Sequence, residues 1–325
     1  MQQVVLNRPG EFVVRRAPDP VADEGRALVR VCRVGVCGTD LHAFKGRQPY
    51  FSYPRVLGHE LGVEVIEVPD NDRGIRPGDR CAVEPYLTCG NCHACRRGRY
   101  NTCESLQTLG VHTDGAMQTY YTIPVENLHR SETLEVDQLA LFETLGVGAH
   151  AVQRGEPRPD DEILVVGAGP IGLGAIQFAK AEGLNLRVLE IVPRRQQFVR
   201  QLGVEVLAEA DGIQADVVID ATGNAPAMEA SFDLVRVCGT LVFVGLYQGR
   251  ISFDDPALNK KEMTVRASRN SAGIFPELIR LIEEGKIDTR PWITHRLPLA
   301  EVPQQFPTLY EQPDLVKAVI DVESP

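Results

Sequence analysis

The chain has 325 residues, enough for two domains with substantial hydrophobic cores. Its formal net charge of -10 argues against a binding surface for nucleic acid or an anionic membrane. Neither a leader segment nor an apolar run of the roughly 18 residues that a membrane span needs is evident. We therefore expect a cytoplasmic protein, in which cysteine thiols stay reduced.

Residues 1–142 are predicted to form a β-rich domain. Short strand-like runs, such as RALVRVCRVGV (26–36), HELGVEVIEV (59–68) and DRCAVEPY (79–86), are separated by turn-forming segments.

Four of the eight cysteines fall within the short segment CGNCHACRRGRYNTC. Four thiolates at this spacing can close on one tetrahedral zinc ion. Such a site has no open position, so this metal is expected to be structural and to fold the lobe that carries it. A redox-active cysteine pair and free thiols are the alternatives, and His93 is expected not to bind. The four proposed ligands are Cys89, Cys92, Cys95 and Cys103.

From about residue 160, strand-like and helical segments alternate, which predicts βαβ units on a parallel sheet. EILVVG (162–167) is a continuous apolar strand of the kind that is buried on both faces, and PIGLGAIQFAKAEG (170–183) has helical periodicity. We place this domain at residues 143–269, and residues 270–325 are predicted to complete the first domain. The further strands are LRVLEI (186–191), VVIDAT (217–222), TLVFVG (240–245) and MTVRAS (263–268), and the further helices are PRRQQFVRQLG (193–203), APAMEASFDLVRVCG (225–239) and FPELIRLIEEGKI (275–287).

The segment VVGAGPIG joins the first of these strands to its helix and contains Gly167, Gly169, Pro170, Ile171 and Gly172. Its glycines permit a tight turn and let a dinucleotide pyrophosphate approach the helix N-terminus. A glycine turn without a ligand is the alternative. We predict that these five residues bind the cofactor.

Glu190 ends the next predicted strand. A carboxylate there can accept hydrogen bonds from the adenosine ribose and repels a 2′-phosphate, which favours NAD over NADP. Arg194 and Arg195 follow closely, and Arg195 is also expected at the cofactor site. These arginines could weaken the preference for NAD, or simply form a surface ion pair with Glu190.

Two upstream motifs, GVCGTDLH and VLGHELG, contain Cys37 and His59. A lone cysteine or histidine is more often a core residue than a metal ligand. Beside a structural-zinc loop and a dinucleotide signature, however, these two supply ligands for a catalytic zinc ion with one open position.

This combination resembles the zinc-containing medium-chain alcohol dehydrogenase family over essentially the whole chain. The resemblance implies an α/β protein with a Rossmann-type cofactor domain, a β-rich GroES-like catalytic domain and two zinc ions per chain. Cys37 and His59 correspond to ligands of the catalytic zinc. Glu143, in LFETLGVGAHAV, corresponds to a glutamate that binds this zinc directly or through water in the polyol-dehydrogenase branch. Thr144 replaces the usual proline, and Glu60 is the alternative third ligand.

The resemblance also implies that Thr39 hydrogen-bonds the substrate hydroxyl and that His42 passes its proton to solvent. An ordinary structural threonine and a surface histidine are the alternatives. The family usually forms homodimers or homotetramers. The connection VEVLAEADGIQADVVIDAT leaves no room for a helix that the family usually carries, so one face of the sheet is expected to be thinly covered, with a partner subunit as a possible cover.

GRQPYFSYPRVLGHE, LGVHTDGAMQTYY and DPALNKKEMTVRASRN resemble bacterial dehydrogenases of sugar acids such as L-galactonate and L-idonate, followed by sorbitol-type polyol dehydrogenases. A sugar acid needs a cation or several donors for its carboxylate. The candidates are Arg269, Asn270 and His112, whereas Lys45 and Arg47 fit a solvated surface better. A non-enzymatic dinucleotide-binding protein and an NADP-dependent reductase without catalytic zinc are the rival functions.

Overall fold

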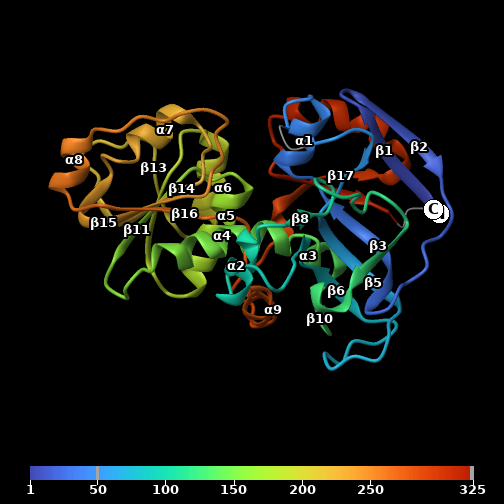
Figure 1. Ribbon diagram of the computed structural model, residues 1–325. Coiled ribbons are helices and arrows are strands. Elements are labelled where there is room, and N and C mark those ends of the chain that lie inside the picture. Colours follow the sequence, from blue (N-terminus) through green and yellow to red (C-terminus); the bar gives the residue numbers. More distant parts are fainter. Residues whose placement is uncertain (49–50, 323–325) are drawn as a thin grey trace. The chain divides into compact units, whose positions relative to one another are not determined.

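The computed structural model describes residues 1–48 and 51–322. The chain divides into two compact units, one formed by Met1–Glu143 with Phe275–Pro325 and the other by Thr144–Ile274 (Figure 1). Within the described ranges, no helix is both long and apolar enough to span a membrane.

The first unit is built mainly from antiparallel strands. A seven-stranded sheet has the order β10-β6-β5-β3-β18-β17, with β9 also paired to β3, and a three-stranded sheet has the order β2-β1-β4. The C-terminal strand β18 completes the larger sheet by pairing with β3, so residues from the two ends of the chain share one hydrophobic core. The strands are β1 (Gln2–Arg8), β2 (Glu11–Arg16), β3 (Arg26–Gly35), β4 (Arg55–Val56), β5 (Glu60–Glu67), β6 (Arg80–Val83), β9 (Tyr120–Pro124), β10 (Leu128–Ser131), β17 (Ile293–Pro298) and β18 (Lys317–Asp321).

Smaller elements connect the strands of this unit. A two-stranded sheet, β7 (Tyr86–Leu87) with β8 (Gln107–Thr108), brackets the cysteine-rich segment. The helices are α1 (Gly38–Phe44), α2 (His93–Arg96), α3 (Val136–Leu139), α9 (Phe275–Glu283) and α10 (Val302–Gln305), with 3-10 turns η1 (Tyr100–Thr102), η2 (Val125–Asn127), η3 (Arg290–Trp292), η4 (Leu299–Glu301) and η5 (Phe306–Glu311).

The second unit contains a six-stranded parallel sheet in the order β13-β12-β11-β14-β15-β16. This arrangement confirms the predicted Rossmann-type sheet. The central strand β11 is buried on both faces, since its residues Ile163, Leu164 and Val165 are all inaccessible to solvent. Its strands are β11 (Glu162–Val166), β12 (Asn185–Leu189), β13 (Glu205–Leu207), β14 (Ala215–Asp220), β15 (Val235–Phe243) and β16 (Thr264–Ala267).

Helix α5 follows the central strand, and its sequence sets both ends. Pro170 occupies the first turn, where its missing N–H costs no helical hydrogen bond, and Gly183 adopts a positive φ of 72° just beyond the last turn. Helix α4 packs closely on α5, since a Cβ atom added to Gly148 would lie 2.4 Å from the backbone nitrogen of Ala175. The helices associated with this unit are α4 (Phe142–Gly155), α5 (Pro170–Ala181), α6 (Pro193–Gln201), α7 (Ala225–Ala230) and α8 (Asp255–Lys260).

The long helix predicted over residues 225–239 is wrong in its second half. Helix α7 ends at Ala230, and strand β15 begins at Val235. The segment contains two β-branched residues, Val235 and Val237, and pairing with β14 decides its conformation.

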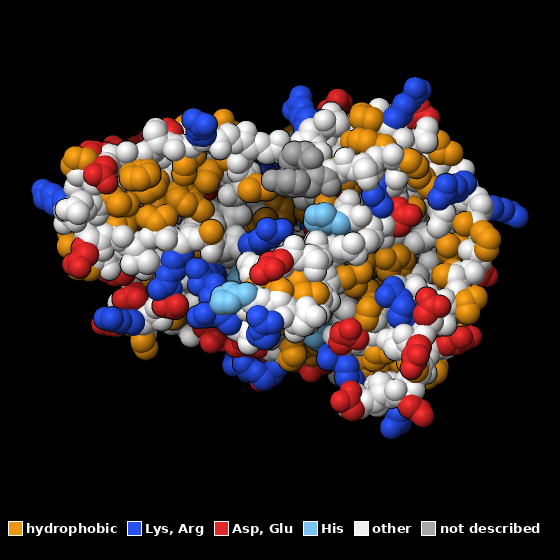
Figure 2. All heavy atoms as spheres, viewed as in Figure 1, with side chains coloured by type: hydrophobic (Ala, Val, Ile, Leu, Met, Phe, Trp, Pro, Cys, Tyr) orange, Lys and Arg blue, Asp and Glu red, His pale blue; other side chains and the backbone are white. Residues whose placement is uncertain are grey.

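One face of this sheet is thinly covered, as the short connection suggested. Residues 208–214 link β13 to β14 without a helix, although β12 and β11 lie between these two strands in the sheet. Figure 2 shows hydrophobic side chains grouped over β13 and β14 on this unit. The cluster on this face keeps several side chains only partly buried: Leu189, Leu207, Ile213, Phe232, Phe243 and Met263.

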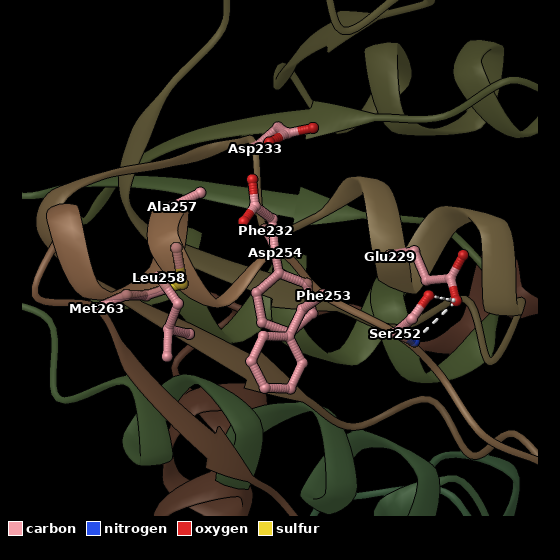
Figure 3. Close-up of a pocket in the computed structure, with 9 residues that line it drawn as sticks. All are labelled: Glu229, Phe232, Asp233, Ser252, Phe253, Asp254, Ala257, Leu258 and Met263. Atoms are coloured by element: carbon pink, nitrogen blue, oxygen red, sulfur yellow. Dashed lines mark hydrogen bonds between the residues drawn. The ribbon is translucent and has the colours of Figure 1, made fainter.

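A pocket of about 370 Å³ lies beside the same cluster. Ser252 closes part of its rim, where its backbone N–H and its hydroxyl donate to Glu229 Oε1 at 2.8 and 2.9 Å (Figure 3). None of the residues proposed from the sequence lines this pocket. The lining residues are Glu229, Phe232, Asp233, Ser252, Phe253, Asp254, Ala257, Leu258 and Met263.

The glycine turn gives a stability prediction. A Cβ atom at Gly172 would lie 2.0 Å from the carbonyl oxygen of Gly167. We expect Gly172→Ala to lower the free energy of unfolding, measured by urea denaturation, by about 1–3 kcal/mol through overpacking. Gly169→Ala is the matched control, because no atom lies within 4 Å of its added Cβ. Equal stabilities of the two variants would contradict this account of the turn.

Candidate functional site

Strand pairing brings the two upstream motifs together in the first unit. β3 and β5 are antiparallel neighbours, and Gly35 at the end of β3 lies opposite Glu60 at the start of β5. This register places Cys37, two residues beyond Gly35, near His59, one residue before Glu60. Cys37 is the N-cap of α1, and its backbone N–H donates to Asp40 Oδ2 at 2.9 Å.

Ligand atoms of Cys37, His59 and Glu60 all lie within 4.8 Å of one another. Gly35 makes room for this group, since a Cβ atom there would lie 2.1 Å from Glu60 Oε2. A thiolate, an imidazole and a carboxylate are all ligands that zinc accepts. The donor set therefore fits a zinc ion with three protein ligands, which leaves a fourth position open.

Asp40 lies behind the imidazole of His59. The carboxylate oxygen Oδ1 is 3.8 Å from His59 Nδ1, and both side chains are buried. Neither of these two atoms has a hydrogen-bond partner within the described part of the chain. Burial opposes the charged imidazolium, but the Asp40 carboxylate and Cys37 raise the pKa of His59 well above its ordinary value. A carboxylate behind a ligating imidazole is a common way to orient it toward a metal.

Lys317, on β18, places a cation at this cluster. Its Nζ donates to Glu60 Oε1 at 2.5 Å, and only 3% of the lysine side chain is exposed. Burial opposes its charge, but Glu60 and Cys37 raise the pKa of Lys317 above its ordinary value. Sequence reasoning missed this residue. Glu60 and Lys317 are 257 positions apart, and only the pairing of β18 with β3 brings Lys317 to the site.

Glu143 lies in the first turn of α4 and is also buried. Its Oε1 accepts a hydrogen bond of 2.7 Å from the hydroxyl of Tyr86, a second residue that the sequence gave no reason to select. Burial raises the pKa of Glu143, while His59 opposes that shift, so the two side chains interact electrostatically. Glu143 is not one of the three side chains that converge within 4.8 Å.

Thr39 and His42 lie on α1, three residues apart and therefore on one face of the helix. Thr39 is half-buried, whereas His42 is exposed. The helix therefore presents a half-buried threonine and, one turn further on, an imidazole that reaches solvent.

The four sulfurs of the cysteine lobe (residues 89–103) converge within 4.8 Å of one another. The Sγ atoms of Cys89 and Cys103 are 3.5 Å apart, close to the spacing of about 3.8 Å that four ligands around a tetrahedral zinc would have at a Zn–S distance of about 2.3 Å. Backbone N–H groups of Asn91 and Cys92 lower the pKa of Cys89 to about 6, whereas burial raises the pKa of Cys95 to about 12. The donor set fits a closed zinc site.

The glycine turn of the second unit has the features expected of a dinucleotide site. Gly167 has a φ of 91°. A Cβ atom added to Gly169 would have no other atom within 4 Å, whereas Gly172 packs directly against the carbonyl oxygen of Gly167. Glu190 is buried behind it, where Oε2 accepts from the Ala168 N–H at 2.7 Å. Pro170 and Ile171, which form the start of α5, are half-buried.

Nη1 of Arg195 lies 4.0 Å from Glu190 Oε2, and the arginine side chain is 45% exposed. This ion pair is therefore weak. Glu190 Oε1 instead accepts from the Val192 N–H at 2.8 Å. Backbone donors therefore orient this carboxylate more than the arginine does.

The substrate candidates occupy separate places. Arg269 and Asn270 follow β16, at the same carboxyl edge of the parallel sheet as the glycine turn after β11. Arg269 is exposed, and Asn270 has a φ of 52°. His112, in the first unit, is exposed and accepts from the Thr108 N–H through Nδ1 at 2.9 Å.

Comparisons with known proteins agree with the division of the chain into a β-rich unit and a parallel-sheet unit. Residues 23–133 match the family model described as alcohol dehydrogenase GroES-like domain, and residues 170–284 match that described as zinc-binding dehydrogenase. L-galactonate-5-dehydrogenase of Escherichia coli K12 is 39% identical over 335 residues, covering 98% of both chains. The β-rich part of the chain is thus confirmed as GroES-like.

Two solved structures show the same fold. The alcohol dehydrogenase RspB of E. coli CFT073, in complex with NADH, matches with a TM-score of 0.92 and 27% identity over 99% of both chains. A zinc-binding dehydrogenase of Sinorhizobium meliloti 1021 bound to NADP matches with a TM-score of 0.90 and 26% identity, again over 99% of both chains. A dinucleotide is therefore bound by both of these neighbours.

The buried cation gives a testable prediction. Lys317→Met should destabilise the metal-free protein by about 3–5 kcal/mol, because Glu60 would be left buried without its ion-pair partner. Urea denaturation in the presence of a chelator measures the loss. Lys286→Met is the matched control, since its ion pair with Glu284 is half-exposed and such pairs contribute at most about 1 kcal/mol. Similar losses in both variants would show that Lys317 does not compensate the buried carboxylate.

Proposed function

Because this chain belongs to the zinc-containing alcohol dehydrogenase family, we propose that it oxidises a secondary hydroxyl group of a sugar acid and transfers the hydride to NAD. The observation that carries this proposal is the convergence of Cys37, His59 and Glu60 within 4.8 Å in a buried site. A chain that had kept only the fold would have no reason to bury such a donor set, which is costly without a metal.

We assign two zinc ions to each chain, one in the cysteine lobe and one at Cys37 and His59. Glu60 supplies the third converging ligand atom, and Glu143 contributes a further carboxylate, directly or through water. A zinc ion held there would act as a Lewis acid and lower the pKa of a substrate hydroxyl group. Thr39 then holds that hydroxyl, and His42, exposed on the same face of α1, passes its proton to solvent.

Glu190 supports NAD rather than NADP as the cofactor. Backbone N–H groups on both sides fix its carboxylate, and a fixed carboxylate can accept hydrogen bonds from ribose hydroxyls but repels a 2′-phosphate. Arg195 is too loosely placed to neutralise it.

A sugar acid is the preferred substrate class because L-galactonate-5-dehydrogenase is similar over almost the whole chain. Arg269 is the best candidate for its carboxylate, since it is an exposed cation at the edge of the sheet where the cofactor turn lies. A neutral polyol is the alternative substrate.

We also propose that the protein is a homodimer or homotetramer. Large hydrophobic side chains of the second unit are exposed, among them Leu246 at 82% and Phe253 at 53%. Contact with another subunit would remove such surfaces from water.

A panel of aldonates and neutral polyols, assayed with NAD and with NADP, tests the proposed function. We expect Arg269→Ala to raise KM for a sugar acid by about tenfold or more, since charge-assisted hydrogen bonds are lost. KM for a neutral polyol should change little. Arg47→Ala, at another exposed arginine, is the control. Equal effects of Arg269→Ala on both substrate classes would rule out the carboxylate assignment.

Cofactor choice can be tested at Glu190. Glu190→Gln keeps the size of the side chain but removes the charge that repels a 2′-phosphate. The ratio of kcat/KM for NADP to that for NAD should rise about tenfold or more, as expected for about one charge-assisted interaction. Glu182→Gln, an exposed neighbour on the same unit, should leave the ratio unchanged. An unchanged ratio in the Glu190 variant would remove the basis for the NAD assignment.

A further inference from the structure

We propose that Tyr86 is a positioning residue that couples the cysteine lobe to the buried carboxylate of Glu143. The inference rests on the proposed function, because it gives Glu143 a role at the site of Cys37 and His59. In this account the metal in the lobe sets the position of the tyrosine ring, and the tyrosine hydroxyl sets the position of the carboxylate.

The ring of Tyr86 packs against the cysteine lobe. It forms a small hydrophobic cluster with Cys103 and Leu106, and Cys92 and Cys95 pack against this cluster. Tyr86 is 3% exposed. Three of the four proposed zinc ligands in the lobe therefore belong to the cluster that holds the ring or pack against it.

The backbone of Tyr86 is fixed at the boundary of the lobe. Tyr86 pairs with Thr108 in the β7–β8 sheet, which joins the two ends of the lobe. The side-chain amide of Asn127 donates to the carbonyl oxygen of Tyr86 at 3.1 Å and to that of Glu84 at 2.6 Å. With the backbone anchored in this way, the position of the hydroxyl depends on how the side chain of Tyr86 is packed.

The hydroxyl of Tyr86 leaves the lobe and donates to Glu143 Oε1 at 2.7 Å. Glu143 is 9% exposed, so little water competes for this oxygen. A hydrogen bond to a buried carboxylate is among the stronger ones in proteins and restricts its rotation. The orientation of the other carboxylate oxygen of Glu143, Oε2, is then also restricted.

These contacts form one continuous path. Zinc holds the four sulfurs in place when it binds the lobe. Without zinc, the four sulfurs are no longer held together, and the packing around the Tyr86 ring loosens. The Tyr86 hydroxyl is then no longer fixed as a donor to the Glu143 carboxylate. The lobe thus acts on the proposed active site through the side chain of Tyr86, in addition to its part in folding.

Tyr86→Phe tests the path, because it keeps the ring in its cluster and removes only the hydroxyl. The open site is loaded with cobalt by brief chelation followed by Co²⁺, and metal analysis verifies that the lobe keeps its zinc. We expect a changed d–d absorption spectrum and a kcat lowered by about tenfold with little change in KM, as for the loss of one charge-assisted hydrogen bond.

Tyr100→Phe is the matched control. Tyr100 lies in the cysteine lobe and, like Tyr86, donates to a carboxylate oxygen, Glu84 Oε1, at 2.9 Å. That carboxylate is not among the side chains assigned to the active site. Tyr100→Phe should keep the wild-type cobalt spectrum and kcat. This result would show that the effect of Tyr86→Phe comes from losing the hydrogen bond to Glu143 and not from losing any tyrosine–carboxylate hydrogen bond.

A double-mutant cycle tests the coupling to the lobe. Leu106→Ala loosens the packing around the ring without changing a cysteine, and it should lower kcat in the wild-type background. In the Tyr86→Phe background the same change should have at least about threefold less effect, because the hydroxyl that transmits it is absent. Residues in contact that share one path are expected to be non-additive in this way.

Two results would overturn the inference alone: a Tyr86→Phe protein with the wild-type spectrum and kcat, or strictly additive effects of the two substitutions in an active enzyme. A wild-type protein that takes up no cobalt beside Cys37, and has no dehydrogenase activity, would overturn the proposed function and this inference with it.

Discussion

The proposed active site depends on burying several ionisable side chains at one point of the first unit. Glu60, His59 and Glu143 are all at most 9% exposed, and placing charged groups away from water is costly unless they are paired or bind a metal. Lys317 compensates one carboxylate directly. The remaining donors define a place where a divalent cation would be stabilised, so the electrostatics and the ligand chemistry lead to the same proposal.

The backbone makes this concentration of polar groups possible. The antiparallel register of β3 and β5 places Gly35 opposite Glu60, and the absence of a side chain at Gly35 leaves room for the carboxylate. β18 then brings Lys317 in from the far end of the chain through its pairing with β3. Cys37 and His59 therefore lie directly at the ends of paired strands, which gives the site a rigid frame.

The second unit follows a different principle, since its features are local. The turn after β11 needs a positive φ at Gly167 and close packing at Gly172, and both requirements arise within a few residues of one another. Its sheet carries little cover beside residues 208–214, which connect β13 to β14 without a helix, and hydrophobic side chains stay partly exposed there. Comparison with the first unit shows that a cofactor turn can be specified locally, whereas the proposed metal site requires long-range pairing.

The sequence by itself determined what depends on neighbours along the chain: the cysteine spacing that brings four sulfurs together, the glycine turn and the alternation of strands and helices. It could not decide where α7 ends, because pairing with β14 overrides the local helical pattern. Nor could it identify Lys317 or Tyr86, whose partners lie 257 and 57 positions away. Only the tertiary structure decided that Glu60 converges with Cys37 and His59 and that Glu143 is held by a tyrosine. The physical reason is that these contacts depend on sheet register and burial, which no short stretch of sequence encodes.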